Sequence, residues 1–309
     1  MKASRYVFLF ALSFIPTILA AQVNDTYVIA AASNASGAFG TRWMTQFSLF
    51  NPQTYPLVVS VTFLPSGGGH PLEAKITVPS NNVVFADNAL QEIFNIGGSG
   101  GFLVASFPED NPSVPNDVVS RSFLVVTNTL NKLPNGGTFG QTIPGVWAGL
   151  QDYNTDGISA ISHGLRNLSS FGWRTNFGGV NLGKSSVGLR IRVYDKNGNT
   201  LLKDVSYTLP GQGHMQWTLP VQVDRGSVEF FVDDPTKQAV VFAYTSTLDQ
   251  YTSDPMYQSP TLLATANVLF RKGIVDPTTL GRKIDITIAR EVRRNATSVG
   301  EVTLSSGSD

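Results

Sequence analysis

A repeat at a spacing of 130 residues constrains the fold of this chain more than any other feature of its sequence. The segment 43–68 aligns without a gap to the segment 173–198. Five positions are identical between the two copies: Trp43/Trp173, Thr45/Thr175, Phe47/Phe177, Asn51/Asn181 and Gly68/Gly198. We therefore expect the chain to build one structural unit twice.

The two copies also share the spacing of their apolar residues. Apolar side chains recur at every second position, at Leu57, Val59, Val61 and Phe63 in the first copy and at Val187, Leu189, Ile191 and Val193 in the second. The phase of this alternation is the same in both copies. A period of two residues with many β-branched side chains predicts a half-buried strand in each.

Turn signals separate short apolar runs along most of the chain, for example at Asn51-Pro52 and Asn197-Gly198. One segment, Asn88 to Phe94, predicts a short helical turn. The pattern as a whole predicts an all-β chain of two tandem immunoglobulin-like antiparallel β-sandwich domains, followed by a C-terminal extra strand segment.

The expected domain organisation begins with a signal peptide at residues 1–21. Lys2 and Arg5 precede an apolar stretch that runs from Tyr6 to Leu19, and Ala20-Ala21 offers small residues for cleavage. The first sandwich domain is expected at 22–148, the second at 149–272, and a basic strand or tail at 273–309. The mature chain is therefore expected to be secreted, periplasmic or on the cell surface, with no membrane span.

Composition excludes several functions. The chain has no Cys, so it holds no disulfide, thiolate zinc site or cysteine nucleophile. Only 14% of its residues are charged, and 22 basic side chains balance 22 acidic ones. A typical soluble chain is about 25% charged. These values argue against a coiled coil and against a basic nucleic-acid-binding protein.

The patterns RTNFGGVNLG…RVYDKNG, NPQTYPLVVSVTFLPSGG and NGGTFGQTIPG resemble those of uncharacterised secreted bacterial proteins that are built from tandem β-sandwich repeats. The resemblance covers most of the chain after residue 21. It implies export and an array of β-sandwiches, and it carries over no catalytic or binding residue.

The sequence shows little sign of catalytic chemistry. The three histidines, His70, His163 and His214, lack a second histidine at metal-binding spacing, and no G-x-S-x-G elbow is present. The acidic pairs Glu109-Asp110 and Asp233-Asp234 stand next to turns, where carboxylates more often bind the backbone. The glycine-rich run 97–101 is expected to be a flexible connection and not a phosphate-binding loop.

The most specific local motif is the run from Asp152 to Gly157, which fits the first half of a calcium-binding loop. A calcium ion there would be held by Asp152, Asn154, Asp156 and the carbonyl of Ile158. The twelfth position, where such a loop supplies a bidentate Glu, is His163. The alternative is a linker rich in Asn and Asp whose side chains form turns.

Tryptophans are the candidate contacts for a ligand, because flat rings offer a large rigid surface to a sugar. Trp43 and Trp173 occupy corresponding positions of the repeat, which favours a packing role for both. Trp147 and Trp217 have no such explanation. They are the candidate ligand contacts.

The C-terminal segment differs from the rest in charge. Residues 271–294 hold seven basic side chains against three acidic ones, and Ile284, Ile286 and Ile288 alternate with other residues as in a strand. One interpretation is a final strand that completes the second domain or pairs back on the first. The other is self-association, in which this strand adds to the sheet of a neighbouring subunit.

These observations favour an exported, non-enzymatic structural or adhesive protein. A carbohydrate-binding module is the alternative, and a secreted hydrolase is the third interpretation. The expected partners are a protein or a polysaccharide, and not a nucleic acid. The only cofactor that the sequence suggests is calcium.

Overall fold

The computed structural model describes residues 24–37, 41–132, 137–147, 158–236, 239–264 and 288–306. Most of these residues lie in antiparallel β-strands, which confirms the expected all-β class. The predicted helical turn is also confirmed, as helix α1 (Ala89–Phe94). Within the part of the chain that is described, no helix is both long and apolar enough to cross a membrane.

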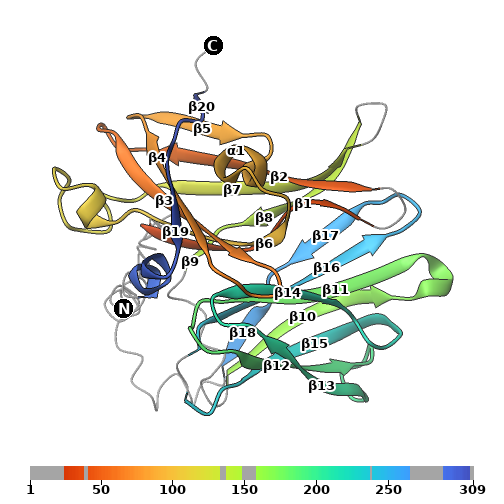
Figure 1. The fold of residues 1–309 in the computed structure, drawn as a ribbon. Helices are drawn as coiled ribbons and strands as arrows, with labels where there is room; N and C mark the ends of the chain where they lie inside the picture. Colours follow the sequence, from red (N-terminus) through yellow and green to blue (C-terminus); the bar gives the residue numbers. More distant parts are fainter. Residues whose placement is uncertain are drawn as a thin grey trace, which may run out of the picture.

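The first nine strands form the N-terminal lobe (Figure 1). They are β1 (Thr26–Ser36), β2 (Arg42–Asn51), β3 (Leu57–Pro65), β4 (Leu72–Val78), β5 (Asn82–Ala86), β6 (Gly98–Ala105), β7 (Leu124–Lys132), β8 (Thr138–Pro144) and β9 (Val146–Trp147). One group of strands has the order β4-β3-β6-β1-β9, and the other has the order β5-β2-β7-β8. The two groups are joined where the end of β1 pairs with the start of β2.

The next nine strands form the C-terminal lobe. They are β10 (Ile158–Asn167), β11 (Trp173–Asn181), β12 (Val187–Tyr194), β13 (Leu201–Leu209), β14 (Gly213–Thr218), β15 (Val223–Asp233), β16 (Val241–Asp249), β17 (Pro255–Gln258) and β18 (Thr261–Ala264). Here one sheet has the order β13-β12-β15-β10-β18 and the other β14-β11-β16-β17. Taken strand by strand in chain order, these are the same two orders as in the N-terminal lobe.

Each lobe has its own apolar core between its two groups of strands. Phe47 on β2 and Phe177 on β11, which are 130 residues apart, are 1% and 0% exposed and lie in the cores of their respective lobes. On β12, Leu189 and Ile191 lie in the core of the C-terminal lobe. Arg190 and Arg192, which alternate with them, point outward and pair with Asp204. The period of two thus separates core from surface as the pleat of a strand requires.

Corresponding polar residues make corresponding hydrogen bonds in the two lobes. Asn51 donates from Nδ2 to the Tyr55 carbonyl, and Asn181 donates in the same way to Ser185. Both asparagines are fully buried and end a strand. Their Oδ1 atoms accept from the backbone N–H two residues later, so each side chain fixes the turn that follows its strand.

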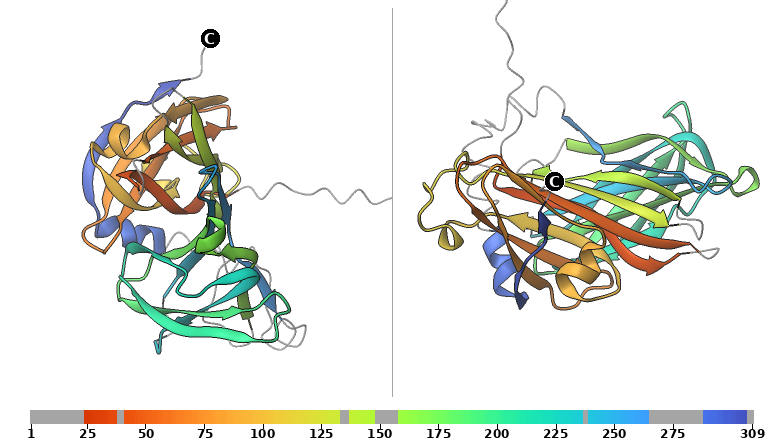
Figure 2. Two further views of the ribbon diagram at one scale, coloured as in Figure 1. Left: turned by 90° about the vertical axis from the view of Figure 1, so that its right-hand side faces the viewer. Right: turned by 90° about the horizontal axis from the view of Figure 1, so that it is seen from above.

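A third apolar core joins the lobes. Val28 on β1 and Leu103 on β6 face outward from the N-terminal lobe and pack with Val180 on β11 and Phe242 on β16. All four residues are at most 1% exposed. Figures 1 and 2 show the lobes stacked through these sheets. Strands β1 and β6 are therefore buried on both faces.

The glycine run at 97–101 is not the flexible connection that its composition suggests. Gly98 begins β6, and Gly100 and Gly101 pair within the sheet. A Cβ atom on Gly101 would overlap Cγ2 of Val180 in the other lobe. Glycine is needed here because the two sheets approach closely.

The C-terminal segment packs on the N-terminal lobe. Residues 288–294 form a helix, so the strand expected to include Ile288 is wrong at that residue, while Ile284 and Ile286 lie outside the described residues. Helical spacing places Ala289 and Val292 in the core between the lobes. Strand β19 (Thr297–Val302) then pairs in parallel with β4, and β20 (Ser305–Ser306) pairs with β5. The described part of the tail therefore pairs back on the first lobe.

The basic residues of this helix reach acids of the N-terminal lobe. Arg290 donates two hydrogen bonds to Glu109 at 3.0 and 2.9 Å. Arg293 lies 2.9 Å from a carboxylate oxygen of Glu73 and 2.6 Å from one of Asp110. The positive charge of the tail thus serves an intramolecular contact in this structure.

Candidate functional site

The predicted calcium site cannot be built from the described residues. Asp152, Asn154 and Asp156 lie outside them, and of Ile158 only the backbone is described, as the first residue of β10. Elsewhere in the described ranges, no three His, Asp or Glu side chains are grouped so that they could hold a metal ion. The calcium site stays a prediction.

The two candidate tryptophans lie on different lobes. Trp147 is half buried on β9, opposite Tyr27 of β1. Trp217 on β14 is also half buried, and its ring packs against Phe177 and Tyr207 with centroid separations of 5.5 and 5.1 Å. The structure thus gives Trp217 a packing partner in the core of the C-terminal lobe. A ligand contact at either residue stays a prediction.

The repeat-related tryptophans have different surroundings. The guanidinium carbon of Arg166 lies 5.2 Å from the ring centroid of Trp173, a cation–π contact. Both tryptophans are half buried, but Trp43 lines a cleft between the lobes. Sequence equivalence therefore does not give these two side chains the same surroundings.

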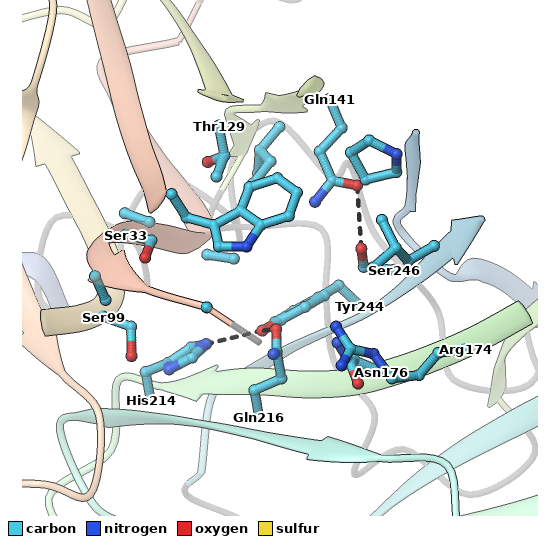
Figure 3. Close-up of a pocket in the computed structure, with 18 of the residues that line it drawn as sticks. Ser33, Ser99, Thr129, Gln141, Arg174, Asn176, His214, Gln216, Tyr244 and Ser246 are labelled. Carbon is cyan, nitrogen blue, oxygen red and sulfur yellow. Dashed lines mark hydrogen bonds between the residues drawn. The ribbon is translucent and has the colours of Figure 1, made fainter. Parts of the chain in front are cut away.

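That interlobe cleft is the candidate functional site, and its volume is about 360 Å³. Small-molecule sites commonly occupy about 300–1,000 Å³ and often lie between domains. One wall comes from β1, β2, β6, β7 and β8 of the N-terminal lobe, and the other from β11, β14, β16 and β17 of the C-terminal lobe. Figure 3 shows polar side chains of both walls facing the space between them.

A chain of hydrogen bonds crosses the floor of the cleft. Oγ of Ser66 lies 2.5 Å from Nδ1 of His214, Nε2 of His214 lies 3.0 Å from the Tyr244 hydroxyl, and that hydroxyl donates to Gln216 over 2.9 Å. Since the single proton of Tyr244 goes to Gln216, a neutral His214 must donate from Nε2 and accept from Ser66 at Nδ1.

Burial keeps this histidine neutral. The side chain of His214 is 2% exposed, and desolvation lowers its pKa to about 3. Burial also raises the pKa of Tyr244 well above its ordinary value. No carboxylate of the described residues bonds to the ring, whose two nitrogens bond to the Ser66 and Tyr244 hydroxyl groups. The arrangement suits a fixed polar network.

One cation lies in the cleft. Of the described residues that line it, Arg174 is the one with a permanent charge, and none is acidic. Its Nε atom is buried and has no hydrogen-bond partner. Nearby, Ser246 of β16 donates to Gln141 of β8 over 3.1 Å, which ties the two walls together (Figure 3).

The acidic pairs from the sequence are occupied by structural contacts. Hydrogen bonds from Arg290 hold the pKa of Glu109 below its usual value, and Asp110 is paired with Lys75 and Arg293. Asp233 accepts from Ser206, and Asp234 caps the turn at Thr236. The histidines His70 and His163 are exposed.

Comparison of the chain with protein-family models, with curated proteins and with solved structures finds no match. The description of the class therefore rests on the structure, which is that of a two-lobed, mostly β protein with a polar cleft between its lobes. Sequence reasoning missed this cleft because its residues form no motif. Ser66 and His214, for example, are 148 positions apart.

Proposed function

We propose that this chain is an exported, non-enzymatic structural or adhesive protein that binds its target and does not transform it. The observation that carries the proposal is the apolar core between the lobes, which includes Val28, Leu103 and Phe242. A buried core of this kind favours one rigid body over two independently moving domains. A rigid body with fixed outer faces suits a scaffold or an adhesive contact.

The proposal includes the architecture. We infer that the lobes are tandem copies of one immunoglobulin-like sandwich, supported by their matching strand orders and by the corresponding bonds of Asn51 and Asn181. Export rests on the signal-peptide pattern of residues 1–21. Self-association through the C-terminal segment stays part of the proposal, although β19 pairs here within its own chain.

A sedimentation experiment tests the proposed adhesive function. Purified residues 22–309 are mixed with cell envelopes and with the extracellular polymer of the producing cells, and the bound fraction is measured after centrifugation. We expect saturable binding that heat-unfolded chain and albumin do not show. Binding no greater than that of albumin would overturn the proposal. Cell fractionation of the same cells tests export separately.

A carbohydrate-binding function is the second candidate, and the cleft favours it. Trp43 offers an aromatic surface, and the side-chain amide groups of Gln141, Asn176 and Gln216 surround the same space. Sugars need both kinds of contact, since their ring faces are apolar and their edges carry hydroxyl groups. Titration calorimetry with a panel of neutral and acidic oligosaccharides tests this function. If no sugar in the panel releases or absorbs heat on binding, the function is refuted.

A further inference from the structure

The charge balance of the interlobe cleft is unusual for this chain. Most other arginines that the structure describes pair with acids, namely Arg121 with Asp25, Arg166 and Arg225 with Asp224, Arg190 and Arg192 with Asp204, Arg290 with Glu109, and Arg293 with Glu73 and Asp110. Arg42 and Arg294 form no salt bridge within the described residues either, but both are exposed to solvent. Arg174 has no acidic partner among the described residues. It lines a cleft in which no other described lining residue carries a compensating negative charge.

The position of Arg174 makes this lack of a partner informative. Its side chain is only partly exposed, and its buried Nε has lost water without gaining an acceptor. An unpaired donor of this kind costs about 1–3 kcal/mol, and more where the group is charged. A ligand in the cleft would supply the opposite charge that the partly exposed guanidinium group of Arg174 lacks. A carboxylate fits best, because its two oxygens match the fork of a guanidinium group.

The remaining lining restricts what carries the carboxylate. Asn176 and Gln216 come from neighbouring strands of the same sheet face as Arg174, and Ser246 lies opposite Asn176 on β16. Their amide and hydroxyl groups can serve both as donors and as acceptors. Trp43 approaches from the other lobe. Hydroxyl-rich edges, one flat face and one negative charge together describe an acidic sugar.

We propose that the interlobe cleft binds a uronic acid unit of an acidic polysaccharide, with the carboxylate on Arg174, the hydroxyl groups on Asn176, Gln216 and Ser246, and the ring face on Trp43. This inference rests on the carbohydrate-binding function proposed above and adds the class of sugar. The cleft volume of about 360 Å³ is at the lower end of the range for small-molecule sites, which suits one or two sugar rings.

Titration calorimetry on residues 22–309 tests the inference with matched pairs of oligosaccharides, galacturonate against galactose and glucuronate against glucose. We expect at least one acidic member to bind about 10- to 100-fold more tightly than its neutral partner, as a charge-assisted pair of hydrogen bonds predicts. Arg174→Gln should remove that preference. Arg174→Lys should keep part of it, because the charge remains but the fork is lost.

The control variant is Arg225→Gln, whose side chain is 61% exposed on the same lobe. It should bind like the unaltered chain. Thermal unfolding of each variant checks that it is folded. If Arg174→Gln does not fold, Arg174→Lys carries the test. Equal binding of acidic and neutral sugars that Arg174→Gln and Arg174→Lys leave unchanged would overturn the inference while the carbohydrate function stands. Binding of neither class would overturn both.

Discussion

One sheet face of the C-terminal lobe is docked, while the corresponding face of the N-terminal lobe is open. The face of β14-β11-β16 that carries Val180 and Phe242 packs on the N-terminal lobe. On β5-β2-β7, Phe50 stands 130 residues before Val180, and its neighbour Leu124 occupies the place of Phe242. Leu124 is 47% exposed, whereas Phe242 is 1% exposed. The same strand order thus serves two different surroundings.

The side chains explain which face docks. Gly178 lies between Gln216 and Tyr244 on the docked face, and Ser48 lies between Phe85 and Val126 on the open one. A Cβ on Gly178 would lie 2.7 Å from the Tyr244 hydroxyl, so glycine makes room for the polar network below the cleft. Glycine thus stands on the docked face where the open face, with the same strand order, carries the side chain of Ser48.

The edges of the lobes differ as well. Strand β4 is covered by β19, whereas no strand of the described residues pairs with the outer edge of β13, the corresponding strand. The open strand carries the exposed charges of Lys203 and Asp204. Charged side chains discourage edge-to-edge pairing. One edge is thus protected by the C-terminal segment and the other by charge.

The largest expected effect comes from truncating the docked face. Phe242→Ala should destabilise the protein by about 3–5 kcal/mol, because it opens a cavity in the core between the lobes. Leu124→Ala, at the corresponding place on the open face, should cost less than about 1 kcal/mol. Denaturant unfolding of both variants measures the difference. Equal losses would mean that the open face is covered in solution.

Removal of the C-terminal segment should have the next largest effect. Ending the chain after residue 287 removes the contacts that Ala289 and Val292 make in the core between the lobes. It also removes β19 and so leaves the edge of β4 uncovered. We expect a loss of about 2–4 kcal/mol, since burial of one Val side chain alone contributes about 1.5–3 kcal/mol. We also expect larger species in light scattering, because the freed β4 edge lacks a partner. An unchanged stability and a strictly unchanged size would contradict the role given to β19.

The pH dependence of His214 gives an intermediate effect. Its folded pKa of about 3 lies below the ordinary 6.5, so the unfolded chain takes up a proton that the folded chain refuses. Stability from this group is therefore complete above pH 6.5 and is lost as the pH falls toward 3. Between pH 6.5 and 5 the loss should approach about 2 kcal/mol.

The matched variant is His214→Gln, which keeps polar groups beside Ser66 and Tyr244 but does not titrate. Its unfolding free energy should fall less steeply between pH 6.5 and 5 than that of the unaltered chain. The corresponding residue of the N-terminal lobe is Val83, opposite Phe50, which cannot titrate at all. Parallel pH profiles for the variant and the unaltered chain would show that His214 is not held neutral.

Local regularities made much of the fold predictable from the sequence. The alternation at 187–193 identified a strand, and the repeat singled out Asn51 and Asn181, whose side chains fix equivalent turns. These features depend on residues close together in the chain. The misassigned strand at Ile288 shows the limit, because a few alternating residues fit the start of a helix equally well.

The cleft could not be predicted in this way. Arg174 and Trp43 approach each other only because the two lobes dock, and docking depends on close contacts such as that of Gly101 with Val180. No spacing in the sequence encodes such a contact. The histidine that proved to be buried, His214, carried no signal that separated it from the exposed His70 and His163.

The smallest expected effect comes from the open face itself. Val126, on β7, is 47% exposed and holds the place that Tyr244 holds on the docked face, where the tyrosine is 1% exposed. Val126→Lys should change the unfolding free energy by no more than about 0.5 kcal/mol, because its head group can reach water. Tyr244→Lys should cost several kcal/mol by the same measurement, since it buries an unpaired charge. A large loss in Val126→Lys at low protein concentration would mean that the face exposed in this structure is buried within the monomer, and the contrast between the two lobes would fail.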